Sequence, residues 1–110
     1  MIKLKDLMTL ERILLEIDVR FKFKLDFGNA LKLYNYLKEV GRITSYAFLL
    51  QDEFHKKYGD IEKLKEYHNE IMKNEIEFDC TDIEKFIDYV YMIHGDEEFV
   101  NIVSEIKFWK

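Results

Sequence analysis

The sequence predicts a mainly α-helical domain of the α+β class, built on a long antiparallel helical hairpin. There is no proline and there are only four glycines among 110 residues, so little interrupts a helix. Apolar residues recur three and four positions apart through much of the chain, which is the spacing of a helix face. With 48% hydrophobic and 15% aromatic residues the chain can bury a core. No linker-like stretch divides it, so residues 1–110 are expected to form one domain.

The longest helix is expected over residues 26–58, with Asp26 as its N-cap. Small or apolar residues form a heptad-like seam along it, suited to packing against another helix. The seam is Ala30, Leu33, Leu37, Val40, Thr44, Ala47, Gln51, Phe54 and Tyr58. Its polar members, Thr44 and Gln51, are expected to fix register. Gly41 leaves two alternatives open, a continuous helix or one that bends or splits there.

A second helix is expected over residues 61–73. Lys56, Lys57 and then Gly59 have the composition of a helix end, and Asp60 can cap the next helix. A turn this short makes the two helices antiparallel neighbours. We therefore expect residues 26–73 to form the hairpin at the centre of the fold.

Three shorter helices are expected to flank the hairpin, over residues 7–17, 82–94 and 97–104. Thr81 and Glu84 have the Thr-x-x-Glu spacing of a capping box, and Asp96 can cap the last helix. Residues 20–25 alternate apolar and charged side chains, which fits an extended connector or a strand.

Three segments could pair into a small sheet, residues 2–5, 75–79 and 105–109. Each contains an apolar, a charged and a large apolar residue in that order. Lys opposite Glu across strands would stabilise the pairing. The alternative for residues 105–109 is that they continue the last helix.

The sequence predicts no catalytic residues, no cofactor and no metal site. His55, His68 and His94 are not spaced to place two ligands on one helix face, and Cys80 has no second cysteine to pair with. No glycine-rich phosphate loop is present. A small enzyme using Cys80 and a distant histidine is kept as a third hypothesis. The single cysteine suits a reducing cytoplasm, and no stretch approaches the roughly 20 apolar residues of a membrane span.

The charge distribution points to a protein partner. Residues 1–74 hold 14 Lys/Arg and 12 Asp/Glu, whereas residues 75–110 hold 3 Lys/Arg and 10 Asp/Glu. The acidic balance argues against direct nucleic-acid binding and favours a partner with a basic surface. The candidate contacts are Asp79, Asp82, Glu84, Asp88, Asp96, Glu97, Glu98 and Trp109. The other interpretation of the acids is a solvated face that aids solubility.

Aromatic residues are a second sign of protein binding. Tyr34 and Tyr36 cannot share one helix face, nor can Tyr89 and Tyr91. At least one of each pair is therefore expected to point away from the core. Exposed tyrosine and tryptophan are enriched at the energetic centres of protein interfaces, although each ring could also cover a secondary contact within the fold.

The middle of the chain, roughly residues 20–88, resembles a group of small phage and prophage proteins of unknown function. The resemblance is carried by the stretches FKLDFGNAL, DEFHKKYGD, EYHNE and IEFD, which begin at Phe23, Asp52, Glu66 and Ile76. In that group a basic and aromatic stretch opens a long helix that ends at a Lys-Tyr-Gly-like stop, and a shorter helix and a strand follow. The resemblance implies a phage or mobile-element origin in the cytoplasm of a low-GC Gram-positive-type host, and it implies no activity.

Two functional hypotheses follow. The first is a non-enzymatic protein-interaction module, such as an acidic inhibitor of a host defence or nucleic-acid-binding protein, with residues 75–110 occupying a basic groove. The second is a homo-oligomeric structural or virion-assembly factor joined through the seam between residues 30 and 58.

Overall fold

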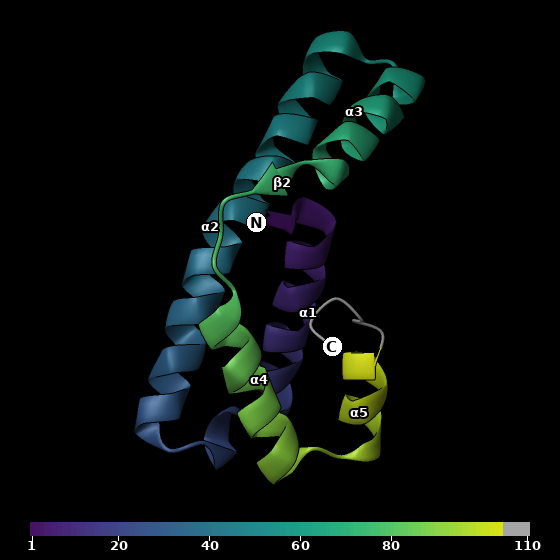
Figure 1. Ribbon diagram of the computed structural model, residues 1–110. Helices are drawn as coiled ribbons and strands as arrows, with labels where there is room; N and C mark the ends of the chain where they lie inside the picture. The colour runs from purple at the N-terminus through teal and green to yellow at the C-terminus, as the bar shows by residue number, and fades with distance from the viewer. Residues whose placement is uncertain (105–110) are drawn as a thin grey trace.

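The computed structural model describes residues 1–104, except that for Ile102 it describes only the backbone. The described elements are mainly helical, with one short two-stranded sheet (Figure 1). In chain order they are β1 (Ile2–Lys3), α1 (Leu4–Phe21), the 3₁₀ turn η1 (Lys22–Lys24), α2 (Phe27–Tyr58), α3 (Ile61–Lys73), β2 (Glu75–Ile76), α4 (Thr81–His94) and α5 (Glu97–Ser104). None of the helices among residues 1–104 is long and apolar enough to cross a membrane.

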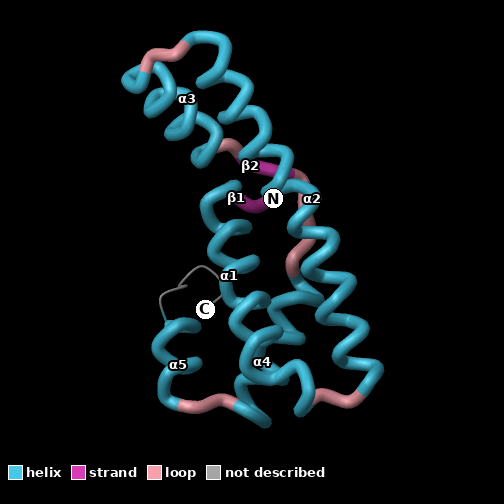
Figure 2. Tube along the Cα trace, turned by 180° about the vertical axis from the view of Figure 1, so that it is seen from behind, coloured by secondary structure: helices cyan, strands magenta, loops and turns pink. Residues whose placement is uncertain are grey.

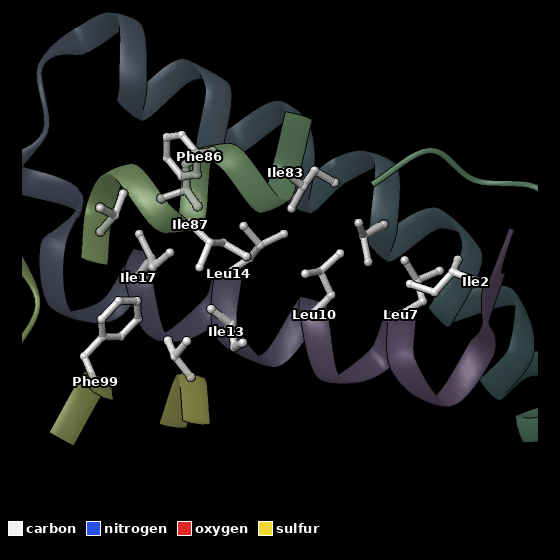
Figure 3. Packing of buried hydrophobic residues seen from close by; sticks show 14 of the residues in the cluster. Ile2, Leu7, Leu10, Ile13, Leu14, Ile17, Ile83, Phe86, Ile87 and Phe99 are labelled. Carbon is white, nitrogen blue, oxygen red and sulfur yellow. The ribbon is translucent and has the colours of Figure 1, made fainter. Parts of the chain in front are cut away.

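The helix at the centre of the fold is α1, which contacts α2, α3, α4 and α5. Figure 2 shows it between α2 on one side and α5 on the other, and Figure 3 shows its apolar side chains meeting those of α4 and α5. Its buried side chains recur at helical spacing because one whole face is covered. They are Leu4, Leu7, Leu10, Ile13, Leu14, Ile17 and Phe21.

The first helix is longer than the expected 7–17, and the expected strand or connector over residues 20–25 is wrong. Phe21 is buried in the last turn of α1, one helical turn after Ile17, so the apolar face simply continues. Phe23 lies in η1 and is 94% exposed. Residues 20–25 alternate like a strand because Lys22 and Lys24 flank Phe23. Of the two phenylalanines in this stretch, only Phe21 joins the core.

Helix α2 is continuous for 32 residues. Asp26 caps it as expected, because its Oδ1 accepts a hydrogen bond from the Asn29 N–H at 2.8 Å. Gly41 does not break it, because packing along the helix outweighs a propensity cost of about 1 kcal/mol. Within the seam, Leu33, Val40, Thr44 and Ala47 are buried.

The α2–α3 hairpin is confirmed, but it is not the centre of the fold. Gly59 ends α2 with a left-handed φ of 62°, and Asp60 caps α3. Helix α3 has only 13 residues, so it covers one end of α2 (Figure 1). There Phe54 stacks on Tyr67 with ring centroids 4.4 Å apart. The middle of the seam packs instead on α1.

The start of α4 differs from the expected capping box. Helix α4 begins at Thr81, and the Thr81 N–H donates to Oδ1 of Asp79 at 3.0 Å. Glu84 does not reach back to the backbone, because its Oε1 accepts a 3.2 Å hydrogen bond from the Cys80 thiol. The Thr81 side chain therefore caps nothing: Asp79 accepts from the Thr81 N–H, and the Glu84 N–H donates to the Cys80 carbonyl.

The expected sheet forms from two of its three segments, but each strand has only two residues, because Leu4 and Lys5 already belong to α1 and residues 77–79 are not in a strand. Strands β1 and β2 pair antiparallel, with Ile2 opposite Ile76 and Lys3 opposite Glu75. The opposite charges of Lys3 and Glu75 favour this register. The third segment, residues 105–109, lies outside the described residues.

The last described helix, α5, is fixed to the C-terminal end of α1. Asp96 caps it as expected, because Oδ1 accepts from the Phe99 N–H at 2.8 Å. Phe99 is fully buried and meets Phe21 edge to face, with centroids 5.3 Å apart. This contact closes the core at one end of the molecule.

Candidate functional site

The acidic residues at the start of α4 have structural roles. Asp79 accepts the hydrogen bonds of Thr81, which lower the pKa of its carboxyl group. Glu84 accepts a hydrogen bond from the Cys80 thiol and is half-buried, whereas Asp79 is exposed. Each carboxylate already accepts a hydrogen bond from a neighbour within the fold.

The acidic residues at the start of α5 surround Arg20. Nη2 of Arg20 lies 2.7 Å from Oε2 of Glu98, and Nη1 lies 3.9 Å from Oδ2 of Asp96. Glu16 holds the same guanidinium at 3.0 Å through Nε. Hydrogen bonds to Glu16 and Glu98 raise the pKa of Arg20. This one cation is shared among three carboxylates, so it offsets only part of the negative charge at the start of α5.

The remaining acidic candidates do not gather into one surface. Asp82, Asp88 and Glu97 are exposed and make no ion pair within residues 1–104. Asp79 and Asp96 lie just before and just after α4, which has 14 residues, so about 20 Å of helix separates the two acidic groups. Trp109 lies outside the described residues.

Cys80 does not have the surroundings of a nucleophile. It is half-buried, and burial together with the hydrogen bond to Glu84 raises its pKa to about 11. The reactive form of cysteine is the thiolate, which is scarce at neutral pH for such a group. Among the residues described, no three His, Cys, Asp or Glu side chains are grouped to hold a metal ion.

Exposed apolar side chains lie on α2 in two groups, Phe27, Leu31 and Tyr34 near its N-terminus and Phe48 and Leu49 about 20 Å farther along the helix. We call these five residues together the outer face of α2. These side chains are between 48% and 73% exposed. Lys38 and Arg42 lie between the two apolar groups, and together with Asn35 and Glu39 they line a shallow hollow of about 330 Å³.

The sequence contained part of this signal. Leu31, Tyr34 and Phe48 lie outside the seam and widen the apolar stripe of α2. The structure covers one side and leaves these three residues exposed. Among residues 1–104, α1 and α3 contact the opposite face of α2, and these side chains stay exposed.

At least one tyrosine of each pair is exposed, as expected. Tyr34 is exposed, whereas Tyr36 is half-buried with its ring 5.5 Å from that of Phe86. Tyr89 and Tyr91 are both largely exposed, and the Tyr91 ring centroid lies 6.3 Å from that of Phe99.

A cleft of about 580 Å³ separates the N-terminal part of α2 from α4. Both helices contribute charged and aromatic side chains to it. The lining residues are Asn29, Lys32, Tyr36, Asp82, Lys85, Phe86 and Tyr89. Burial, and then the nearby charge of Asp82, raises the pKa of Tyr36. A second, more apolar hollow of about 430 Å³ lies where Gln51 of α2 meets α3.

Comparison of the chain with family models, with curated proteins and with solved structures gives no match. What the protein does must therefore be inferred from its own surfaces.

Proposed function

We propose that this chain is a non-enzymatic protein-binding module whose main contact surface is the outer face of α2. The observation that carries the proposal is that α2 has two apolar faces. One face is buried on α1 and α3, through Leu33 and Val40 among others, while the outer face is exposed. Exposed apolar patches rimmed by polar residues are typical of protein-interaction sites.

The outer face has the composition of an interface centre. Tyr34 and two phenylalanines provide large, rigid contact areas. Burying one such side chain completely stabilises a complex by about 1.5–3 kcal/mol, and these side chains have roughly half of that area to contribute. Lys38 and Arg42 between the apolar groups favour a partner that presents an acidic residue at the middle of the contact.

Photo-crosslinking tests the proposal directly. A photoreactive phenylalanine analogue is placed at Leu49 on the outer face, and in a control chain at Lys63, which is exposed on α3. In the native host the Leu49 position should give a discrete cross-linked protein, and the Lys63 position should not. Tyr34→Ser should abolish that adduct without lowering the melting temperature. Equal labelling from both positions, or none from Leu49, would contradict the proposal.

An acidic inhibitor remains a second candidate, supported by the exposed carboxylates of Asp82, Asp88 and Glu97. A partner that binds through these charges should lose affinity steeply between about 0.1 M and about 1 M salt, as the Debye length falls from roughly 10 Å to roughly 3 Å. Binding through the outer face of α2 should change little over that range. Measuring the dissociation constant at both salt concentrations separates the two modes.

Homo-oligomerisation through the seam is disfavoured, because Leu33, Val40, Thr44 and Ala47 are already buried within one chain. Self-association through the outer face of α2 would be detected by light scattering at rising concentration. The phage or prophage origin stays a prediction of the sequence resemblance, and a cytoplasmic location stays part of this proposal.

A further inference from the structure

The cleft between α2 and α4 is lined by cationic and aromatic side chains from both helices. Tyr36 and Phe86 form its floor, with ring centroids 5.5 Å apart at an interplanar angle of 65°. Lys32 on α2 and Lys85 on α4 line the two walls, and Tyr89 lies beside them. Both lysines are exposed and make no ion pair among residues 1–104.

The order of residues gives the cleft a polarity. Helices α2 and α4 run in opposite directions along it (Figure 1). Because Tyr36 faces Phe86, Lys32 lies one turn toward the Tyr89 end, and Asp82 lies one turn toward the other end. One end of the cleft therefore carries Lys32 and Tyr89 and the opposite end carries Asp82, while Lys85 lies beside Phe86 between them.

We infer that this cleft binds a peptide segment in which an Asp or Glu is next to an aromatic or large aliphatic residue. The peptide carboxylate would lie between the Lys32 and Lys85 ammonium groups, and its apolar neighbour would pack on Tyr36, Phe86 and Tyr89. Asp82 would repel a second carboxylate, so the residue on that side should be neutral or basic. The volume of about 580 Å³ suits a ligand of a few residues.

Chemical-shift titration tests this inference on the full chain. The probe is the blocked dipeptide N-acetyl-phenylalanyl-glutamate amide, and its uncharged control has glutamine in place of glutamate. The glutamate peptide should move the amide signals of Lys32, Tyr36, Lys85 and Tyr89 in a saturable way. The glutamine peptide should bind about two- to thirtyfold more weakly, which is the range that two exposed ion pairs produce.

Paired charge reversals provide the matched control. Lys32→Glu with Lys85→Glu should remove the preference for glutamate and confer one for N-acetyl-phenylalanyl-lysine amide. Lys63→Glu with Lys65→Glu, on exposed positions of α3, should leave the preference unchanged. All four positions are exposed, so the variants should fold, which circular dichroism verifies.

Two results would overturn the inference. One is no saturable movement of the cleft signals, and the other is equal affinity for the glutamate and glutamine peptides. Leu31→Ser and Tyr34→Ser should leave dipeptide binding intact while they abolish the crosslink from position 49. Failure of peptide binding at the cleft can thus be distinguished from failure of partner binding at the outer face of α2.

Discussion

The hydroxyl group of Thr44 on α2 donates a 2.8 Å hydrogen bond to Oε2 of Glu11 on α1. Thr44 is the buried polar residue of the described core, at 2% exposure, and a second acceptor, the Val40 carbonyl, lies farther away at 3.3 Å. Gln51 plays a similar part nearer the tip, where its Oε1 lies 2.6 Å from Nδ1 of His68 on α3. The polar interruptions of the seam thus join α2 to two different helices.

Replacing Thr44 by Val should destabilise the protein by about 1–2 kcal/mol, because the half-buried Glu11 carboxylate loses its donor while the shape of the side chain is kept. The matched control is Thr9→Val, since the Thr9 hydroxyl bonds only to the Lys5 carbonyl of its own helix. Urea denaturation of both variants measures the difference. An effect of Thr44→Val no larger than that of the control would show that the inter-helix bond contributes nothing.

Gly41→Ala and Gly95→Ala should have opposite signs. A Cβ at Gly41 would meet Oε2 of Glu11 at 3.5 Å, an ordinary contact, and alanine favours a helix interior over glycine by about 1 kcal/mol. A Cβ at Gly95 would overlap the Tyr91 carbonyl oxygen. Thermal melts should therefore show Gly41→Ala above and Gly95→Ala below the parent protein. The same sign for both would contradict the close approach at Gly95.

Cys80 should react slowly with iodoacetamide. A pKa of about 11 in place of the ordinary 9.0 lowers the thiolate fraction at pH 8 by about 100-fold, so the folded chain should be alkylated far more slowly than the urea-unfolded chain. Glu84→Gln should speed the reaction, because Glu84 contributes to the raised pKa. Equal rates in the folded and unfolded chains would contradict this environment.

The same group should make stability depend on alkaline pH. The unfolded chain releases the Cys80 proton near pH 9 and the folded chain near pH 11, so the unfolded state binds fewer protons between these values. The free energy of unfolding should therefore fall as the pH rises from about 9 to about 11. Cys80→Ser removes this contribution, and its stability should fall less over that range when both proteins are unfolded with urea.

Leu31 and Leu33, two residues apart on α2, should respond very differently to truncation. Leu33 is 1% exposed, whereas Leu31 is 48% exposed. Leu33→Ala should cost about 2–5 kcal/mol, and Leu31→Ala should cost less than about 1 kcal/mol. Denaturation of the two variants tests which face of α2 is buried, and similar losses from both would mean that the outer face is covered in the isolated chain.

Local signals predicted much of the fold. Asp26, Asp60 and Asp96 each cap the helix that they precede, and Gly59 takes the left-handed conformation that ends α2, because caps depend on neighbours within a few residues. The position of α1 was not predicted. Periodicity shows that a helix has an apolar face, but it does not show which helices will cover that face.

The candidate site was harder to predict, because its charges are balanced by residues distant in the sequence. Arg20 meets Asp96 and Glu98 only after α5 has packed on α1, and a count of charges cannot show this. The α2–α4 cleft likewise brings Lys32 near Lys85 only through the folded arrangement. The exposed tyrosines were foreseen, because adjacent faces of a helix cannot both point inward.

Hydroxyl-radical footprinting of the isolated chain tests most directly whether α2 is buried on one face and open on the other. At low micromolar concentration Leu31, Tyr34, Phe48 and Leu49 should be oxidised readily, while Leu33 and Val40 should be protected. Protection of the first group, or comparable oxidation of both groups, would contradict the account.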